Sequence, residues 1–185
     1  FVVFGMYIVV VTSIGRAGRR GSNWMITGAA ALFNVALNLI LIPPFVSQAG
    51  ALGGIFASRT ASKLQIGVIT ARGLPETPAL VDASIVSALS LAVFAMVGVV
   101  AFVLGVATDL VGMPSFQALV GGTILSGLVV TPITLVASYY LAIGTFRFGL
   151  DPDNQSVPII TSAMDLAGVA TVLFVMTSLG VLPNG

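Results

Sequence analysis

Long apolar runs, each close to the length that crosses a lipid bilayer, dominate this sequence. The clearest run is 83–107, which contains no charged residue. About 20 apolar residues in a helix span the roughly 30 Å of hydrocarbon in a bilayer. Only 7% of the 185 residues are charged and 57% are hydrophobic, whereas soluble domains carry about 25% charged residues. The sequence therefore predicts an all-α, multispan integral membrane protein in contact with lipid, and not a soluble enzyme.

Breaks rich in proline and glycine divide the chain into predicted helices. We expect five full transmembrane helices and a partial one at 1–14. The full helices are predicted at 24–42, 45 to about 70, 83–107, 117–146 and 156–180. Pro43 and Pro44 are expected to end the first full helix, because proline lacks a backbone N–H and clashes with the preceding turn.

The basic residues predict the orientation of these helices. Cytoplasmic loops carry an excess of Lys and Arg. We therefore place the linker 15–23 on the cytoplasmic side of a cell membrane and the C-terminus on the outer side. This puts the following basic residues at or near the cytoplasmic side: Arg16, Arg19, Arg20, Lys63, Arg72 and Arg147, with Arg59 about one turn deeper. The acidic loop residues expected on the same side are Glu76, Asp82, Asp151 and Asp153. No basic run is long enough to indicate nucleic-acid binding.

The absence of histidine and cysteine limits the chemistry that is available. The chain has neither residue, which excludes disulfides, thiol chemistry, imidazole metal sites and histidine-dependent catalysis. A metal ion would therefore be bound by oxygen atoms, and oxygen ligands favour hard cations such as Mg2+, Ca2+ or Mn2+.

Asp165 is the candidate ion ligand, because it is the one acidic residue inside a predicted span. If the last helix begins near Ser156, Asp165 lies roughly 14 Å along it, near the bilayer midplane. An isolated charge at that depth costs about 3 kcal/mol and usually faces a polar pathway or a partner. Thr161 and Ser162, four and three residues earlier, and Gly168, three residues later, share its helical face. We therefore predict Asp165, Thr161 and Ser162 as metal-binding residues in a pore wall.

One carboxylate does not neutralise a divalent ion, so a second copy of the chain is expected to supply another. Two Asp165 side chains across a two-fold axis would repel each other when empty and would be relieved by Mg2+, which uses one or two carboxylates and keeps several waters. A paired second half-transporter is an alternative partner. Asp165 has other possible roles: an ion pair with Arg59, a cap for a broken helix, or a proton relay.

Two further groups of residues are candidates for the pore or its entrance. The stretch SQAGALGG places Gly50 and Gly54 four residues apart, which indicates close helix packing, and Ser47 and Gln48 beside them are candidate pore-lining residues. Asp151 and Asp153 precede the last helix. They favour its start and are candidates for attracting cations to the entrance.

Residues 45–182 resemble the membrane domain of the MgtE family of magnesium channels and transporters. The resemblance rests on PFVSQAGALGGIFASRTASKLQIGVIT and on GLDPDNQSVPIITSAMDLAGV, with its D-P-x-N and T-x-x-x-D-x-x-G motifs. It implies five spans, a homodimer with the pore on its axis, Asp165 at the ion site, Mg2+ as the transported ion and no organic cofactor. The sequence departs from the family where Gly50–Ala51 replaces a common glycine–asparagine pair, and we expect it to lack the regulatory cytoplasmic domains of many members.

Residues 1–44 resemble a different family, the polysaccharide flippases, in the motif N-x-x-L-N-x-x-L-I-P-P. We therefore expect two parts, 1–44 of separate origin and 45–185 for cation transport, joined in a fusion where the two resemblances meet. The start at Phe1 leads us to expect a fragment or a processed chain. The alternative functions are a flippase fragment and a membrane subunit that does not transport, in which Asp165 bridges helices.

Overall fold

A computed structural model describes residues 24–109 and 113–181 of the chain. Every regular element in these residues is an α-helix: α2 (Trp24–Gln65), α3 (Thr77–Ala107), α4 (Phe116–Arg147) and α5 (Pro152–Ser178). Four segments are long and apolar enough to cross a membrane: Leu39–Gln65, Thr77–Ala107, Phe116–Arg147 and Asn154–Ser178. This confirms an all-helical, multi-pass membrane protein. The count of five full spans and a partial one is not confirmed, and the predicted helix at 1–14 lies outside the described residues.

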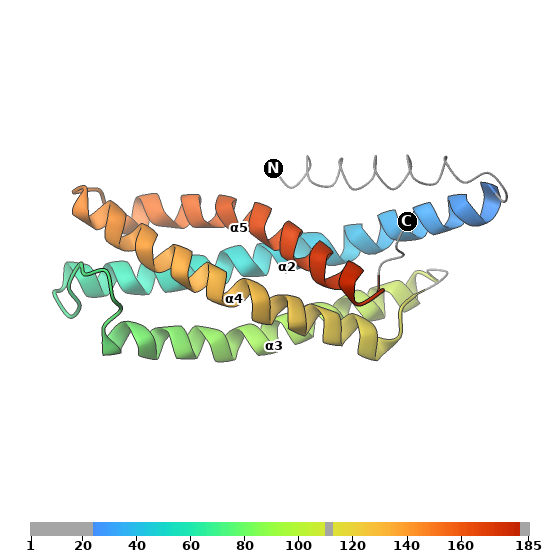
Figure 1. The fold of residues 1–185 in the computed structure, drawn as a ribbon, viewed down its shortest axis with the longest axis horizontal. Helices are drawn as coiled ribbons and strands as arrows, with labels where there is room; N and C mark the ends of the chain where they lie inside the picture. Colours follow the sequence, from blue (N-terminus) through green and yellow to red (C-terminus); the bar gives the residue numbers. More distant parts are fainter. Residues whose placement is uncertain (1–23, 110–112, 182–185) are drawn as a thin grey trace.

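Helices α2 and α4 each pack against the other three helices, whereas α3 and α5 do not pack against each other. Figure 1 shows the four helices running roughly along one long axis, with α2 and α5 side by side and α3 on the opposite side of the bundle.

The predicted break at Pro43–Pro44 is wrong, because α2 continues through both prolines. Each proline removes one backbone hydrogen bond, at a cost of about 3 kcal/mol in an exposed helix. Here the flanking residues are firmly held: Leu41, Ile42 and Phe45 are at most 2% exposed. Packing against neighbouring helices therefore favours a continuous helix over the local preference for a stop, as is common for transmembrane helices that contain proline.

Two other predicted boundaries are also displaced. Helix α3 begins at Thr77 and not at 83, so Asp82 lies inside a candidate span and not in a loop. Helix α5 begins at Pro152 and not near 156. Asp165 nevertheless lies near the middle of the span Asn154–Ser178, as predicted from the length of the apolar run.

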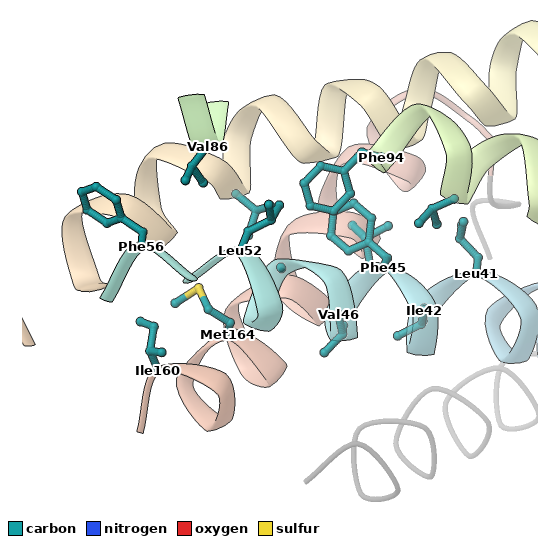
Figure 2. Packing of buried hydrophobic residues seen from close by; sticks show 14 of the residues in the cluster. Leu41, Ile42, Phe45, Val46, Leu52, Phe56, Val86, Phe94, Ile160 and Met164 are labelled. Carbon is teal, nitrogen blue, oxygen red and sulfur yellow. The ribbon is translucent and has the colours of Figure 1, made fainter. Parts of the chain in front are cut away.

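The core between these helices combines large apolar side chains with close helix contacts. The rings of Phe45 in α2 and Phe94 in α3 lie 4.6 Å apart at their centroids, and Figure 2 shows Ile160 and Met164 reaching the same cluster from α5. The ring of Phe94 fits against Gly127 of α4, where a Cβ would lie 2.3 Å from Cδ2 of the ring. Phe94 can therefore be buried only because residue 127 has no side chain.

The loop between α2 and α3 is fastened to the end of α4. Tyr139 donates a hydrogen bond from its hydroxyl to the Leu74 carbonyl at 3.0 Å, and Tyr140 donates one to the Gly73 carbonyl at 3.0 Å. Arg147 Nε donates to the Ala71 carbonyl at 3.0 Å. These side chains fix the loop at this end of the bundle.

The contact between α3 and α4 is expected to tolerate no side chain at Gly98. A Cβ there would lie 2.2 Å from Thr123 Oγ1 and 2.9 Å from Val120 Cα, and the latter is a backbone atom. Gly98→Ala should therefore lower stability by about 1–3 kcal/mol, as overpacked cores do. Gly121→Ala is the matched control, because open space surrounds Gly121 and alanine favours a helix by about 1 kcal/mol. Thermal unfolding in detergent would measure both, and equal melting temperatures would contradict the packing described.

Candidate ion groove between α2 and α5

Helices α2 and α5 approach closely along small residues. A Cβ on Gly50 would lie 3.4 Å from Thr161 Cα, and a Cβ on Gly168 would lie 3.3 Å from a methyl group of Val46. Gly54 is in a similar position against Val157, at 3.4 Å. The GxxxG spacing in SQAGALGG therefore mediates helix packing, as predicted.

Beside this contact lies an open groove made of two adjoining hollows, which we call the α2–α5 groove. The first hollow has a volume of about 330 Å³ and is lined by Pro43, Val46, Ser47, Gly50, Thr161 and Asp165. The second has a volume of about 520 Å³ and is lined by Gly50, Ala51, Gly54, Ile55, Ser58, Arg59, Val157 and Thr161. The hollows share Gly50 and Thr161. Along α2 the groove extends from Pro43 to Arg59, about 24 Å at roughly 1.5 Å per residue, which is most of the hydrocarbon thickness.

Asp165 and Thr161 line this groove from α5. Asp165 is half-buried, and none of the basic residues that the structure describes forms an ion pair with it. Thr161 donates its hydroxyl to the carbonyls of Val157 and Pro158, both at 3.0 Å, which leaves its oxygen as an acceptor toward the groove. The carboxylate therefore lies near mid-span, beside open space and a hydroxyl oxygen.

The other predicted site residues are distributed differently. Ser47 and the two glycines, Gly50 and Gly54, line the groove, whereas Gln48 is half-buried and is not part of its wall. Ser162 is exposed on α5 outside the groove wall. The sequence grouped it with Asp165 because residues three apart share a helical face. That face is wider than the groove.

Asp151 and Asp153 lie at the start of α5, at the end of the bundle where α2 finishes. Asp151 accepts hydrogen bonds from Gln65 at 3.3 Å and from the Asn154 side chain at 2.7 Å. It directly precedes the first residue of α5, as expected for a residue that favours a helix start. The side chain of Asp153 lies outside the described residues. A role for these carboxylates in attracting cations remains a prediction.

Sequence reasoning missed a cluster of charges at this same end. Asp82 in α3 is 1% exposed, and its Oδ1 accepts a hydrogen bond from Arg59 Nη2 at 2.7 Å. Its Oδ2 lies 2.5 Å from Lys63 Nζ, an ion pair without hydrogen-bond alignment. Lys63 also donates to the Pro78 carbonyl at 2.7 Å. Asp165 is therefore not the only intramembrane acid, and Arg59 pairs with Asp82 and not with Asp165.

A local signal for this cluster was present in the sequence. Proline is favoured in the first turn of a helix, and Pro78 lies in the first turn of α3 after the N-cap Glu76. From that start, Asp82 falls on the same helical stripe as buried Val86 and Ser90.

In the loop before α3, hydrogen bonds from the Thr70 hydroxyl and backbone N–H lower the pKa of Glu76, which keeps this carboxylate ionised.

Within the described residues, no group of three or more acidic side chains could enclose a metal ion. A cation in the groove would therefore meet Asp165, hydroxyl and carbonyl oxygens, and water.

Comparison with known proteins shows that the family model MgtE, described as a divalent cation transporter, matches residues 42–175. This range contains the whole groove and leaves out residues 1–41. No curated protein and no solved structure matches the chain.

A water-filled groove predicts different reactivity for thiols placed on its wall and on the lipid-facing surface. The chain has no native cysteine, so each introduced thiol is the only one. Ser47→Cys in the groove should react at least about tenfold faster with a charged, membrane-impermeant reagent than Ala92→Cys, because the thiolate is the reacting species and does not form in lipid. Ala92 is an exposed residue in the middle of α3. Mass spectrometry would measure the labelling rate of each variant in liposomes. Equal rates for the two variants would contradict a hydrated groove.

Proposed function

Since this chain belongs to the MgtE family of divalent cation transporters, we propose that it carries Mg2+ across a membrane along the α2–α5 groove, with Asp165 as the principal ligand. The observation that carries this proposal is the position of the Asp165 carboxylate. It lies near mid-span beside open space, and no described basic side chain neutralises it. A charge at that depth without a fixed partner destabilises the protein unless a mobile cation or water reaches it.

The groove suits an ion that keeps its water. Mg2+ gives up its waters reluctantly and is commonly held by one or two carboxylates with several waters still bound. Six waters occupy about 180 Å³ at roughly 30 Å³ each, and the hollow beside Asp165 has a volume of about 330 Å³. The hydroxyls of Ser47 and Thr161 border the same hollow and would serve as hydrogen-bond acceptors for those waters.

We place a second copy of the chain over the groove. A single chain offers one carboxylate at mid-span and an open groove, which neither balances a divalent charge nor excludes lipid from the ion. A two-fold axis beside the groove would bring two Asp165 carboxylates to one ion and would close both grooves into a single pore. A homodimer therefore supplies the missing wall and the missing charge together.

The direction of the pathway follows from the basic residues. Arg59, Lys63, Arg72 and Arg147 lie at or near the end of the bundle that holds the α2–α3 loop and the start of α5. We assign this end to the cytoplasmic side of a cell membrane. A cation drawn inward by the membrane potential would then pass Asp165 first and Arg59 last.

Replacing the carboxylate tests the proposal. Asp165→Asn keeps the shape of the side chain and removes its charge. Because the attraction for a divalent ion is lost, Mg2+ uptake should fall at least about tenfold. An encapsulated dye would measure this uptake into liposomes. Asp109→Asn is the matched control, because Asp109 is exposed at the far end of α3 and has φ 49°, a conformation that asparagine also adopts. Unchanged uptake with Asp165→Asn would refute the assignment.

A further inference from the structure

The basic residue in the wall of the α2–α5 groove is unexpected for a cation pathway. Arg59 lines the second hollow beside Ser58 and Gly54, and its side chain is 51% exposed. Asp165 and Arg59 are the charged side chains among the described residues that line the two hollows. A free guanidinium there would repel each divalent cation that passes.

Asp82 restrains that charge from outside the groove. Its side chain is 2% exposed, and it contacts Arg59 from α3 while Arg59 reaches the groove from α2. Lys63, one turn after Arg59 on α2 and itself bonded to the Pro78 carbonyl, is paired with the other carboxylate oxygen. The carboxylate is therefore held between two cations and cannot turn away from Arg59 without losing both contacts.

We propose that Asp82 is a positioning residue for transport, which holds the Arg59 guanidinium against α3 and screens its charge so that cations can pass this end of the groove. The inference rests on the proposed function, since it assigns a role in the same pathway. Asp82, Arg59 and Lys63 together carry one net positive charge. Without the Asp82 carboxylate they carry two, and Arg59 is free to extend into the second hollow.

The size of the effect follows from simple electrostatics. One additional positive charge within about 6 Å of a divalent ion in water-like surroundings raises its energy enough to slow passage about tenfold. The Debye length falls from about 30 Å at 0.01 M salt to about 3 Å at 1 M salt. A defect caused by an unscreened charge must therefore become smaller as salt is added, whereas a defect caused by misfolding must not.

The first experiment measures Mg2+ flux in liposomes for wild type, Asp82→Asn, and the double variant Asp82→Asn with Arg59→Gln. We expect Asp82→Asn to be about tenfold slower at low salt and to approach wild type at high salt. The double variant has the net charge of the wild-type cluster and should recover most of the flux. A defect in Asp82→Asn that is independent of salt, or that persists in the double variant, would overturn the inference, as would wild-type flux in Asp82→Asn.

A second measurement does not depend on transport. Ser58→Cys places a single thiol in the groove beside Arg59, and the ratio of its reaction rates with anionic and cationic thiol reagents reports the local charge. Asp82→Asn should raise this ratio about tenfold, and adding Arg59→Gln should return it. An unchanged ratio would refute the positioning role. If wild type carries no Mg2+, the proposed function fails, and the thiol ratio still decides how Asp82 acts on Arg59.

The single variant Arg59→Gln covers the case in which Asp82→Asn does not assemble. It removes the obstructing charge and leaves the Asp82–Lys63 pair in place. Flux should then be no slower than in wild type at either salt concentration. A large loss of flux in Arg59→Gln would mean that Arg59 is needed for transport or folding in its own right, and would overturn the inference.

Discussion

The close approach of α2 and α5 is the constraint on which the rest of this structure depends. Gly50, Gly54 and Gly168 allow the two backbones to meet, because residues without side chains permit close helix contact in a bilayer. The same small residues leave a groove beside the contact, and Asp165 lines that groove near mid-span. Larger side chains at Gly50 would separate the helices and fill the space beside the carboxylate. Helix packing and the candidate ion pathway are thus two consequences of the same residues.

Charge is distributed along the groove in a way that suits a passing cation. A carboxylate without a described basic partner lines the first hollow near mid-span, and a guanidinium lines the second hollow. The two acids inside the spans have different environments: Asp82 is nearly fully buried between Arg59 and Lys63, whereas Asp165 is half-buried beside open space. A buried carboxylate with permanent counter-charges has a structural or positioning role. One without them is available to a mobile ion.

Much of the fold follows from the sequence, and the errors have physical causes. The apolar runs predicted α4 almost to the residue and placed Asp165 near mid-span. Two helix boundaries were wrong: tertiary packing keeps α2 helical through Pro43 and Pro44, and α3 begins at Thr77, just before Pro78, and not at 83. Spacing along one helix groups Asp165 with both Thr161 and Ser162, whereas the groove wall contains Asp165 and Thr161 and leaves out Ser162, because the width of a groove is set by the neighbouring helix. The Asp82 cluster joins residues far apart in the chain, which periodicity within one segment cannot reveal.

The central claim is that the Asp165 carboxylate serves a mobile divalent cation shared between two chains. Anomalous diffraction from crystals of the assembled protein soaked in Mn2+, an oxygen-preferring substitute for Mg2+, tests it most directly. The account predicts one anomalous peak on a two-fold axis, within about 5 Å of both Asp165 carboxylates, a distance that one coordinated water can bridge. An Asp165 carboxylate closed off by a basic side chain, or a peak that lies only elsewhere in the molecule, would contradict it.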